Sequence, residues 1–212
     1  MQVVALAQQK GGVMKSSLAV HLAAEALRGG AHAVVFEMDK QGTASFWAQR
    51  RGGAAPDVRR VDSMQLSREL RAASDAGAAY VFLDLPGAHN PAVSPAIRAA
   101  DLVLIPARPA EVDIVASAET LGTVQRLGKR YVYVLTFVPA AGSRAAEARE
   151  ALESEGHPVA PTPIGDRKVF SDAVVAGQTA AEREPGGKAA GEIASLWRYV
   201  QTQLESKHVE VA

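Results

Sequence analysis

The sequence of 212 residues contains no cysteine. A chain without cysteine cannot hold a cysteine-ligated iron–sulfur cluster, and it suits a reducing compartment. Aromatic residues are also scarce, at 5% of the chain against 48% hydrophobic residues in total. We therefore expect an aliphatic, alanine-rich core of the kind that α/β packing produces.

Net charge and long apolar runs are missing as well. The 23 basic and 23 acidic residues cancel, so no global field attracts nucleic acid and any such contact requires a local patch. No apolar run approaches the roughly 18 residues of a membrane span, and the N-terminus lacks the basic region of a signal peptide. We expect a cytoplasmic protein with a single domain over residues 1–212.

A glycine-containing loop lies between the apolar run 3–7 and the helical pattern 18–27. Strand, glycine loop and helix in this order are the context of a phosphate-binding loop, where backbone N–H groups and the helix start converge on an anion. Lys15 would neutralise the β- and γ-phosphates, and the Ser16 hydroxyl would ligate Mg²⁺. The alternative is a Gly-Gly turn with nearby lysines and no ligand. The residues expected to bind nucleotide are Lys10, Gly11, Gly12, Val13, Met14, Lys15, Ser16 and Ser17.

Two aspartates end apolar runs farther along the chain. Asp39 follows the run 33–38, and Asp84 closes the run 80–84 just before a Pro-Gly turn. Carboxylates at the ends of parallel strands would face the phosphate loop. Asp84 is expected to bind Mg²⁺ opposite Lys15. Asp39 is expected to act in hydrolysis, and the alternative is that it merely caps the following helix.

The loop departs from the pattern G-x-x-x-x-G-K-[ST], because Gln9 and Met14 occupy the two glycine positions. What remains is K-G-G-x-x-K-S, with a second lysine at Lys10. This resembles the deviant Walker A loop of the ParA/MinD family of P-loop ATPases, usually K-G-G-x-G-K-[ST]. The resemblance implies ATP and Mg²⁺ as cofactors. It also implies that Lys10 reaches across an ATP-sandwiched dimer to the partner's nucleotide, so the expected catalytic residues are Lys10, Lys15 and Asp39.

Other segments extend the resemblance over nearly the whole chain. Where the family commonly reads D-x-D-P-Q-G, this chain has Glu37-Met38-Asp39-Lys40-Gln41-Gly42. Asp39 matches the aspartate that positions the attacking water, whereas Glu37 and Lys40 replace an aspartate and a proline. Residues 100–109 are similar to the family's A-D-l-v-l-i-P-x-x-P strand and the loop that follows it, and in the family that loop lies near the dimer interface; the alternative is an ordinary core strand with proline stops. The order of elements after residue 159 is similar to that of the small plasmid-type members.

The alternation of apolar runs and helical patterns predicts an α/β fold. We expect a mostly parallel sheet covered by helices on both faces, as in P-loop NTPases, with nucleotide at the carboxyl ends of the strands. The expected strands are 3–7, 33–38, a short one that starts at 59–61, 80–84, one within 100–109, 131–137 and 159–164. The expected helices are 16–27, one starting near 45, 63–76, 111–127, 144–155 and 188–204.

The resemblance implies a compact ParA-type partition ATPase. Such a protein has weak intrinsic ATPase activity, forms a homodimer with ATP, binds DNA non-specifically, and responds to a centromere-binding or cargo adaptor protein that stimulates hydrolysis. Its cargo would be a plasmid, a chromosome locus or a protein assembly positioned along the nucleoid. The candidate DNA contacts are Arg167 and Lys168, joined by Arg183, Lys188 and Arg198; the alternative is that these are scattered solvated charges.

Two other functions remain open. A MinD-like membrane-cycling ATPase would need a basic amphipathic C-terminal helix, but residues 201–212 have little apolar face and carry two glutamates. We therefore expect no membrane partner. A nucleotide-binding scaffold with little turnover is the second alternative, because Met14, Glu37 and Lys40 all depart from the family pattern.

Overall fold

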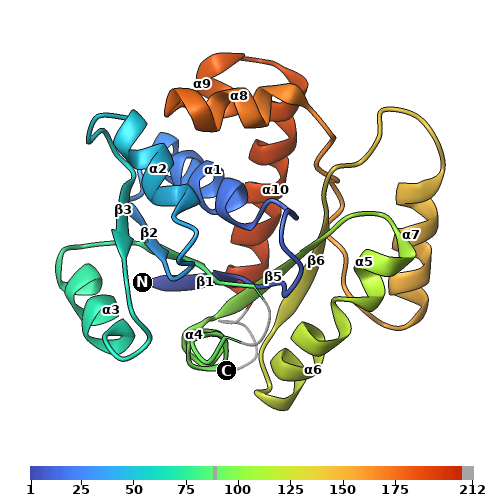
Figure 1. Ribbon diagram of the computed structural model, residues 1–212, viewed down its shortest axis with the longest axis horizontal. Coiled ribbons are helices and arrows are strands. Elements are labelled where there is room, and N and C mark those ends of the chain that lie inside the picture. Colours follow the sequence, from blue (N-terminus) through green and yellow to red (C-terminus); the bar gives the residue numbers. More distant parts are fainter. Residues whose placement is uncertain (88–89, 207–212) are drawn as a thin grey trace.

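Parallel strands form one central sheet in the computed structural model, which describes residues 1–87 and 90–206. The six strands of this sheet follow the order β3-β2-β4-β1-β5-β6, and every pairing is parallel (Figure 1). Parallel sheets of this kind are buried on both faces, which explains why the inner strands are continuous apolar runs. The expected fold class is confirmed. The strands are β1 (Gln2–Leu6), β2 (Ala33–Glu37), β3 (Asp57–Arg60), β4 (Tyr80–Asp84), β5 (Leu102–Ala107) and β6 (Tyr131–Leu135).

Helices cover both faces of the sheet and enclose two aliphatic cores. Alternate residues of a strand point to opposite faces. In β1, Val4 and Leu6 therefore pack towards α1 and α10, whereas Val3 and Ala5 belong to the core beneath α3, α4, α6 and α7. The helices are α1 (Lys15–Arg28), α2 (Thr43–Arg50), α3 (Leu66–Asp75), α4 (Val93–Ala99), α5 (Glu111–Val115), α6 (Ala118–Arg126), α7 (Arg144–Ser154), α8 (Lys168–Ala176), α9 (Ala180–Arg183) and α10 (Lys188–Glu205).

The prediction was wrong at several places. Residues 159–164 form no strand and make only the isolated bridge of Val159 to Tyr133, because prolines at 161 and 163 remove two ladder donors. The expected helix 111–127 divides into α5 and α6 at Ser117, whose hydroxyl donates to the Ile114 carbonyl oxygen at 2.5 Å. Strand β3 begins at Asp57, two residues before the expected start. Helix α4 was not predicted.

The C-terminal stretch bears on the membrane alternative. Residues 201–205 complete α10, whereas residues 207–212 lie outside the described residues. Among the helices that the structure describes, none is both long and apolar enough to cross a membrane.

Candidate functional site

The loop of residues 9–14 leaves the carboxyl end of β1 and leads into α1. Gly12 and Met14 both adopt left-handed backbone angles, with φ of 70° and 69°. A side chain in that region costs roughly 1–2 kcal/mol, which a glycine would avoid. The Met14 side chain is buried and packs into the core under α1, so its burial offsets the backbone cost. Met14 thus holds the loop in a conformation that would otherwise favour glycine.

Lys15 is the buried cation of this loop. It begins α1, is 7% exposed, and its ammonium donates to the Lys10 carbonyl oxygen at 3.4 Å. Burial lowers the pKa of Lys15, and the nearby carboxylates of Asp84 and Asp39 oppose that shift. A desolvated lysine among amide donors is a strong site for a polyanion. The cavity beside it, of about 240 Å³, is lined by residues 11–17 together with Asp39, Gln41, Thr43, Gly87 and Phe137.

Asp84 lies at the end of β4, in register with Leu6 of β1. It is fully buried, and neither of its carboxylate oxygens meets a hydrogen-bond partner within the described residues. Burial raises the pKa of Asp84 to about 7, against the opposing influence of the Ser16 hydroxyl and of Lys15. An orphaned buried carboxylate beside a serine hydroxyl fits a hard cation such as Mg²⁺, which binds proteins through one or two such groups and completes its shell with phosphates and water. The described residues contain no cluster of three or more His, Cys, Asp or Glu side chains suited to a metal, so phosphate oxygens would be required.

The carboxylates of Asp39 and Glu37 have different hydrogen-bond partners. Glu37 is buried, and its carboxylate accepts hydrogen bonds from the amides of Ala44 at 2.7 Å and Ser45 at 3.0 Å. Arg60 donates to the same carboxylate at 3.2 Å. Among the described residues, the Asp39 side chain instead accepts a hydrogen bond only from the Gln41 amide, at 3.0 Å, and it lines the phosphate cavity. Glu37, not Asp39, therefore caps α2, which removes the main alternative to a chemical role for Asp39.

Shortening Glu37 to aspartate, the residue that family members commonly carry, is expected to destabilise this protein by about 1–3 kcal/mol. One methylene fewer withdraws the carboxylate from the first turn of α2 and leaves buried donors unsatisfied. Urea unfolding of Glu37→Asp measures the loss. The exposed Glu150→Asp on α7 is the control, and equal stability of the two variants would contradict the capping role.

Lys10 is held by its own chain. Its ammonium lies 2.9 Å from Asp113 Oδ2 on α5, and Asp113 is 5% exposed. The other oxygen, Asp113 Oδ1, has no hydrogen-bond partner within the described residues. Lys10 therefore points along the surface towards α5 rather than into its own phosphate cavity. Sequence reasoning missed Asp113; its only signal was its place in the loop after the A-D-l-v-l-i-P-x-x-P segment.

Two further residues near the loop were also missed. The Arg108 guanidinium donates to the Gly12 carbonyl oxygen at 2.9 Å and lies over the Phe137 ring, 4.6 Å from its centroid. Phe137 has a φ of 51°, which is unusual for an aromatic residue. Strained residues cluster at functional sites, and this one lines the phosphate cavity together with Asp39. No sequence pattern marks a positive φ at phenylalanine.

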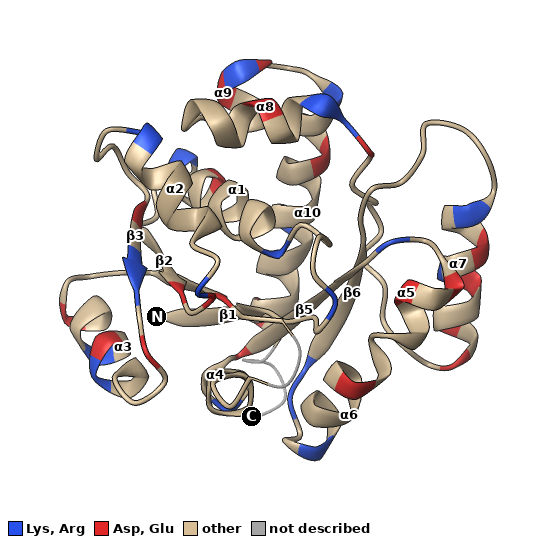
Figure 2. Cartoon of the chain, viewed as in Figure 1, with Lys and Arg blue, Asp and Glu red and all other residues tan. Residues whose placement is uncertain are grey.

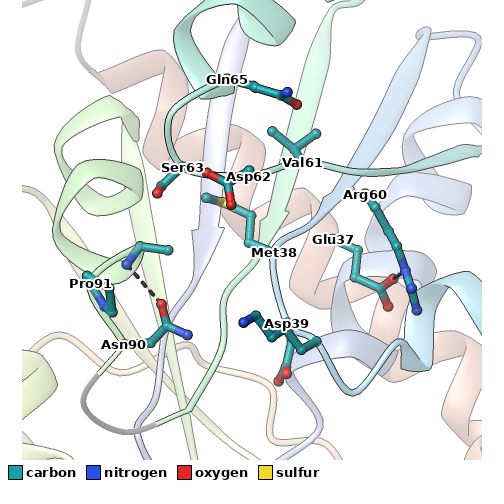
Figure 3. A pocket seen from close by; sticks show the side chains of 12 residues that line it. Glu37, Met38, Asp39, Arg60, Val61, Asp62, Ser63, Gln65, Asn90 and Pro91 are labelled. Atoms are coloured by element: carbon teal, nitrogen blue, oxygen red, sulfur yellow. Dashed lines mark hydrogen bonds and ion pairs between the residues drawn. The ribbon is translucent and has the colours of Figure 1, made fainter.

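A second cavity, of about 510 Å³, adjoins the first and shares Asp39 with it. Figure 3 shows its lining at the ends of β2 and β3 and before α4, including Met38, Asp62 and Asn90. Asp39 is only partly buried and lines both cavities.

The candidate DNA residues are placed less favourably. Arg167 and Lys168 lie at the start of α8, but Arg167 forms a two-oxygen ion pair with Glu192, with its Nη2 2.5 Å from Oε1. Arg183 donates to the Gln178 side chain at 3.3 Å. Lys168 is exposed and forms no ion pair with another described residue. Arg167 and Lys168 thus adjoin at the start of α8, and of these two residues only Lys168 has no ion pair within the described part of the chain.

Comparison with known proteins agrees with this geometry. The sequence model described as the CobQ/CobB/MinD/ParA nucleotide binding domain matches residues 4–180. A relative from Gloeobacter kilaueensis, "Maintenance of carboxysome distribution protein A", is 32% identical over 208 residues, which cover 96% of this chain and 94% of the relative.

Solved structures share the fold. The MinD cell division protein of Aquifex aeolicus superposes with a TM-score of 0.79 at 14% identity, over 95% of this chain and 98% of that one. MinD of Pyrococcus horikoshii, solved in complex with Mg-ADP, superposes with a TM-score of 0.74 at 13% identity, over 94% and 95% of the two chains. With the phosphate loop, the strand order and a family match over most of its length in agreement, the chain belongs to the CobQ/CobB/MinD/ParA family of nucleotide-binding domains.

Proposed function

We propose that this protein is an ATP-hydrolysing positioning protein of the ParA/MinD type. The observation that carries the proposal is the arrangement of Lys15, Asp84 and Asp39 around one phosphate loop, with the Asp84 oxygens unpartnered in the described structure. A relative that covers almost the whole chain is named for carboxysome distribution. That relative favours a protein assembly as the cargo, over a plasmid or chromosome locus.

Each residue has a chemical task in this proposal. The loop amides and Lys15 would bind the β- and γ-phosphates, while Ser16 and Asp84 would hold Mg²⁺. Such a metal would supply neutralisation of the phosphate charge. Asp39 accepts a hydrogen bond from the attacking water and holds it in line with the γ-phosphorus. Its exposure to the second cavity gives water access.

The finer part of the proposal concerns Lys10. A lysine is a point charge on a flexible stem, and the stem that now reaches Asp113 also allows it to reach the nucleotide of a second copy. Under two-fold symmetry both copies would exchange this contact. ATP would then favour a dimer, the dimer would bind DNA without sequence preference along the nucleoid, and an adaptor protein would stimulate hydrolysis.

Lys10→Ala is expected to retain one nucleotide per chain. Its affinity for a second copy in the presence of ATP should fall at least tenfold, because the contact exists only between copies. Sedimentation with ADP and with a non-hydrolysable ATP analogue measures this effect. Asp39→Ala is the matched variant: it should dimerise with ATP and lose hydrolysis. Binding of random-sequence duplex DNA, measured with and without the analogue in the same samples, tests whether DNA binding requires the dimer.

A Lys10→Ala variant that dimerises like the wild type would show that Lys10 only binds Asp113. Wild type that stays monomeric with the analogue would contradict the ATP dimer itself. Normal hydrolysis by Asp39→Ala would contradict the proposed role of that carboxylate.

A further inference from the structure

The segment that joins β5 to α5 lies beside the loop that joins β1 to α1, and both segments carry basic positions (Figure 2). The basic residue of the β5–α5 segment is Arg108, whose guanidinium donates to the Gly12 carbonyl oxygen at 2.9 Å. The same guanidinium lies over the Phe137 ring, 4.6 Å from its centroid. Stacking on a ring restricts the directions of the guanidinium N–H groups, so Phe137 helps to aim Arg108 at Gly12.

The next carbonyl of the loop is also bound by a side chain. Thr136 follows β6 and is fully buried, and its hydroxyl donates to the Val13 carbonyl oxygen at 3.4 Å. The Thr136 amide donates to the Ala107 carbonyl oxygen at 2.8 Å, which fixes this residue against the end of β5. Neither Arg108 nor Thr136 lines the phosphate cavity. Two consecutive carbonyls are therefore bound from outside the cavity.

These two contacts determine where the following amides point. In a planar trans peptide, the carbonyl and the N–H of the next residue point in opposite directions. The peptides that follow Gly12 and Val13 are both trans. With their carbonyls turned towards Arg108 and Thr136, the N–H groups of Val13 and Met14 are turned towards the cavity that both residues line. Within the described part of the chain, neither amide donates a hydrogen bond.

This loop has a particular need for such support. Met14 adopts a φ of 69°, at the position where the loops that it resembles carry glycine. An unfavourable backbone conformation persists only where the surrounding structure fixes it. The Met14 side chain fixes the end of the loop in the core under α1. Arg108 and Thr136 fix the two carbonyls that precede it.

We propose that Arg108 and Thr136 are positioning residues, which orient the Val13 and Met14 amides towards the phosphates of a bound nucleotide. The proposal rests on the proposed function, in which the loop amides bind phosphate. Both side chains contact loop carbonyls, so their effect on the nucleotide passes through the backbone. Because ADP and ATP share the β-phosphate, the two residues should support the binding of both nucleotides.

Two other roles predict different results. If Arg108 supplied only positive charge near the phosphates, lysine would replace it. In the positioning role lysine does not suffice, because a compact ammonium lacks the planar fork that stacks on Phe137. If the two residues only stabilised the fold, their loss would lower the free energy of unfolding and would leave the directions of the loop N–H bonds unchanged.

Titration calorimetry with Mg-ADP and with a non-hydrolysable ATP analogue tests the proposal. Arg108→Gln and Arg108→Lys should both bind each nucleotide about tenfold more weakly than wild type. Thr136→Val should lose about threefold, and Thr136→Ser, which keeps the hydroxyl, should restore wild-type affinity. Arg126→Gln and Thr123→Val are the matched controls on α6, and both should bind as wild type does.

Residual dipolar couplings of the nucleotide-free protein measure the directions of the N–H bonds themselves. The coupling of the Val13 N–H should change in Arg108→Gln and that of the Met14 N–H in Thr136→Val, while the couplings of the sheet stay as in wild type. Unchanged couplings in both variants would overturn the proposal, and so would wild-type affinity of Arg108→Lys beside weak binding by Arg108→Gln. Wild type that binds neither nucleotide would contradict the proposed function instead, and the couplings would still decide whether these side chains orient the loop.

Discussion

Replacing Lys15 with alanine is expected to weaken ATP binding by about 2–5 kcal/mol, which is roughly a 30-fold to several-thousand-fold loss of affinity. Lys15 is the buried cation of the phosphate cavity, and the folded protein already holds it there despite the desolvation that lowers its pKa. No further free energy is therefore needed to position Lys15 when the phosphates bind. The alanine variant would leave phosphate charge facing Asp84 and Asp39 without a fixed counter-ion.

Titration calorimetry with a non-hydrolysable ATP analogue and Mg²⁺ measures this loss. Lys40→Ala is the control, because Lys40 is exposed and lines the neighbouring cavity instead. The control should bind within about twofold of wild type. Affinity of Lys15→Ala equal to that of Lys40→Ala would remove the loop from the nucleotide site.

The sequence was sufficient where a local pattern dictates the structure. Apolar periodicity bounded by the Gly-Gly pair predicted a helix over 16–27, and α1 spans Lys15–Arg28. The run ending in Asp84 predicted β4 with the carboxylate at its end, because four consecutive apolar residues suit a strand buried on both faces. The alternation of such runs with helices also predicted the sheet class and the covering of both its faces.

Contacts between segments that lie far apart in the chain could not be predicted from the sequence. Asp113 lies about a hundred residues after Lys10, and no spacing rule links a loop lysine after β1 to a short helix after the neighbouring strand β5. From the sequence, Glu37 was only a departure from the family's aspartate, and its hydrogen bonds to the first turn of α2 could not be predicted. The Arg167 pair with Glu192 depends on how α10 packs beneath α8. In each case tertiary packing, not local propensity, decides the partner.

The free energy of unfolding of the nucleotide-free protein should depend on pH because of Asp84. Burial raises the pKa of this carboxyl from 3.8 to about 7 in the folded state, so the folded protein holds a proton that the unfolded chain releases at lower pH. The folded state is therefore favoured most below about pH 4 by this group, and that advantage declines as pH rises towards 7. A shift of this size corresponds to about 4 kcal/mol in total.

Asp84→Asn removes the titrating group, so we expect it to gain stability over wild type as pH increases, by about 4 kcal/mol between pH 4 and pH 7.5. Urea unfolding of both proteins across this range measures the difference, and the exposed Asp57→Asn is the control that should follow wild type. The same charged oxygens that cost stability are those that Mg²⁺ needs. Mg²⁺ with nucleotide should therefore stabilise wild type more at pH 8 than at pH 6, since proton and metal compete for Asp84, and it should stabilise Asp84→Asn far less at either pH. Parallel stability curves for Asp84→Asn and wild type would show that Asp84 is already ionised in the folded protein and that another group neutralises it.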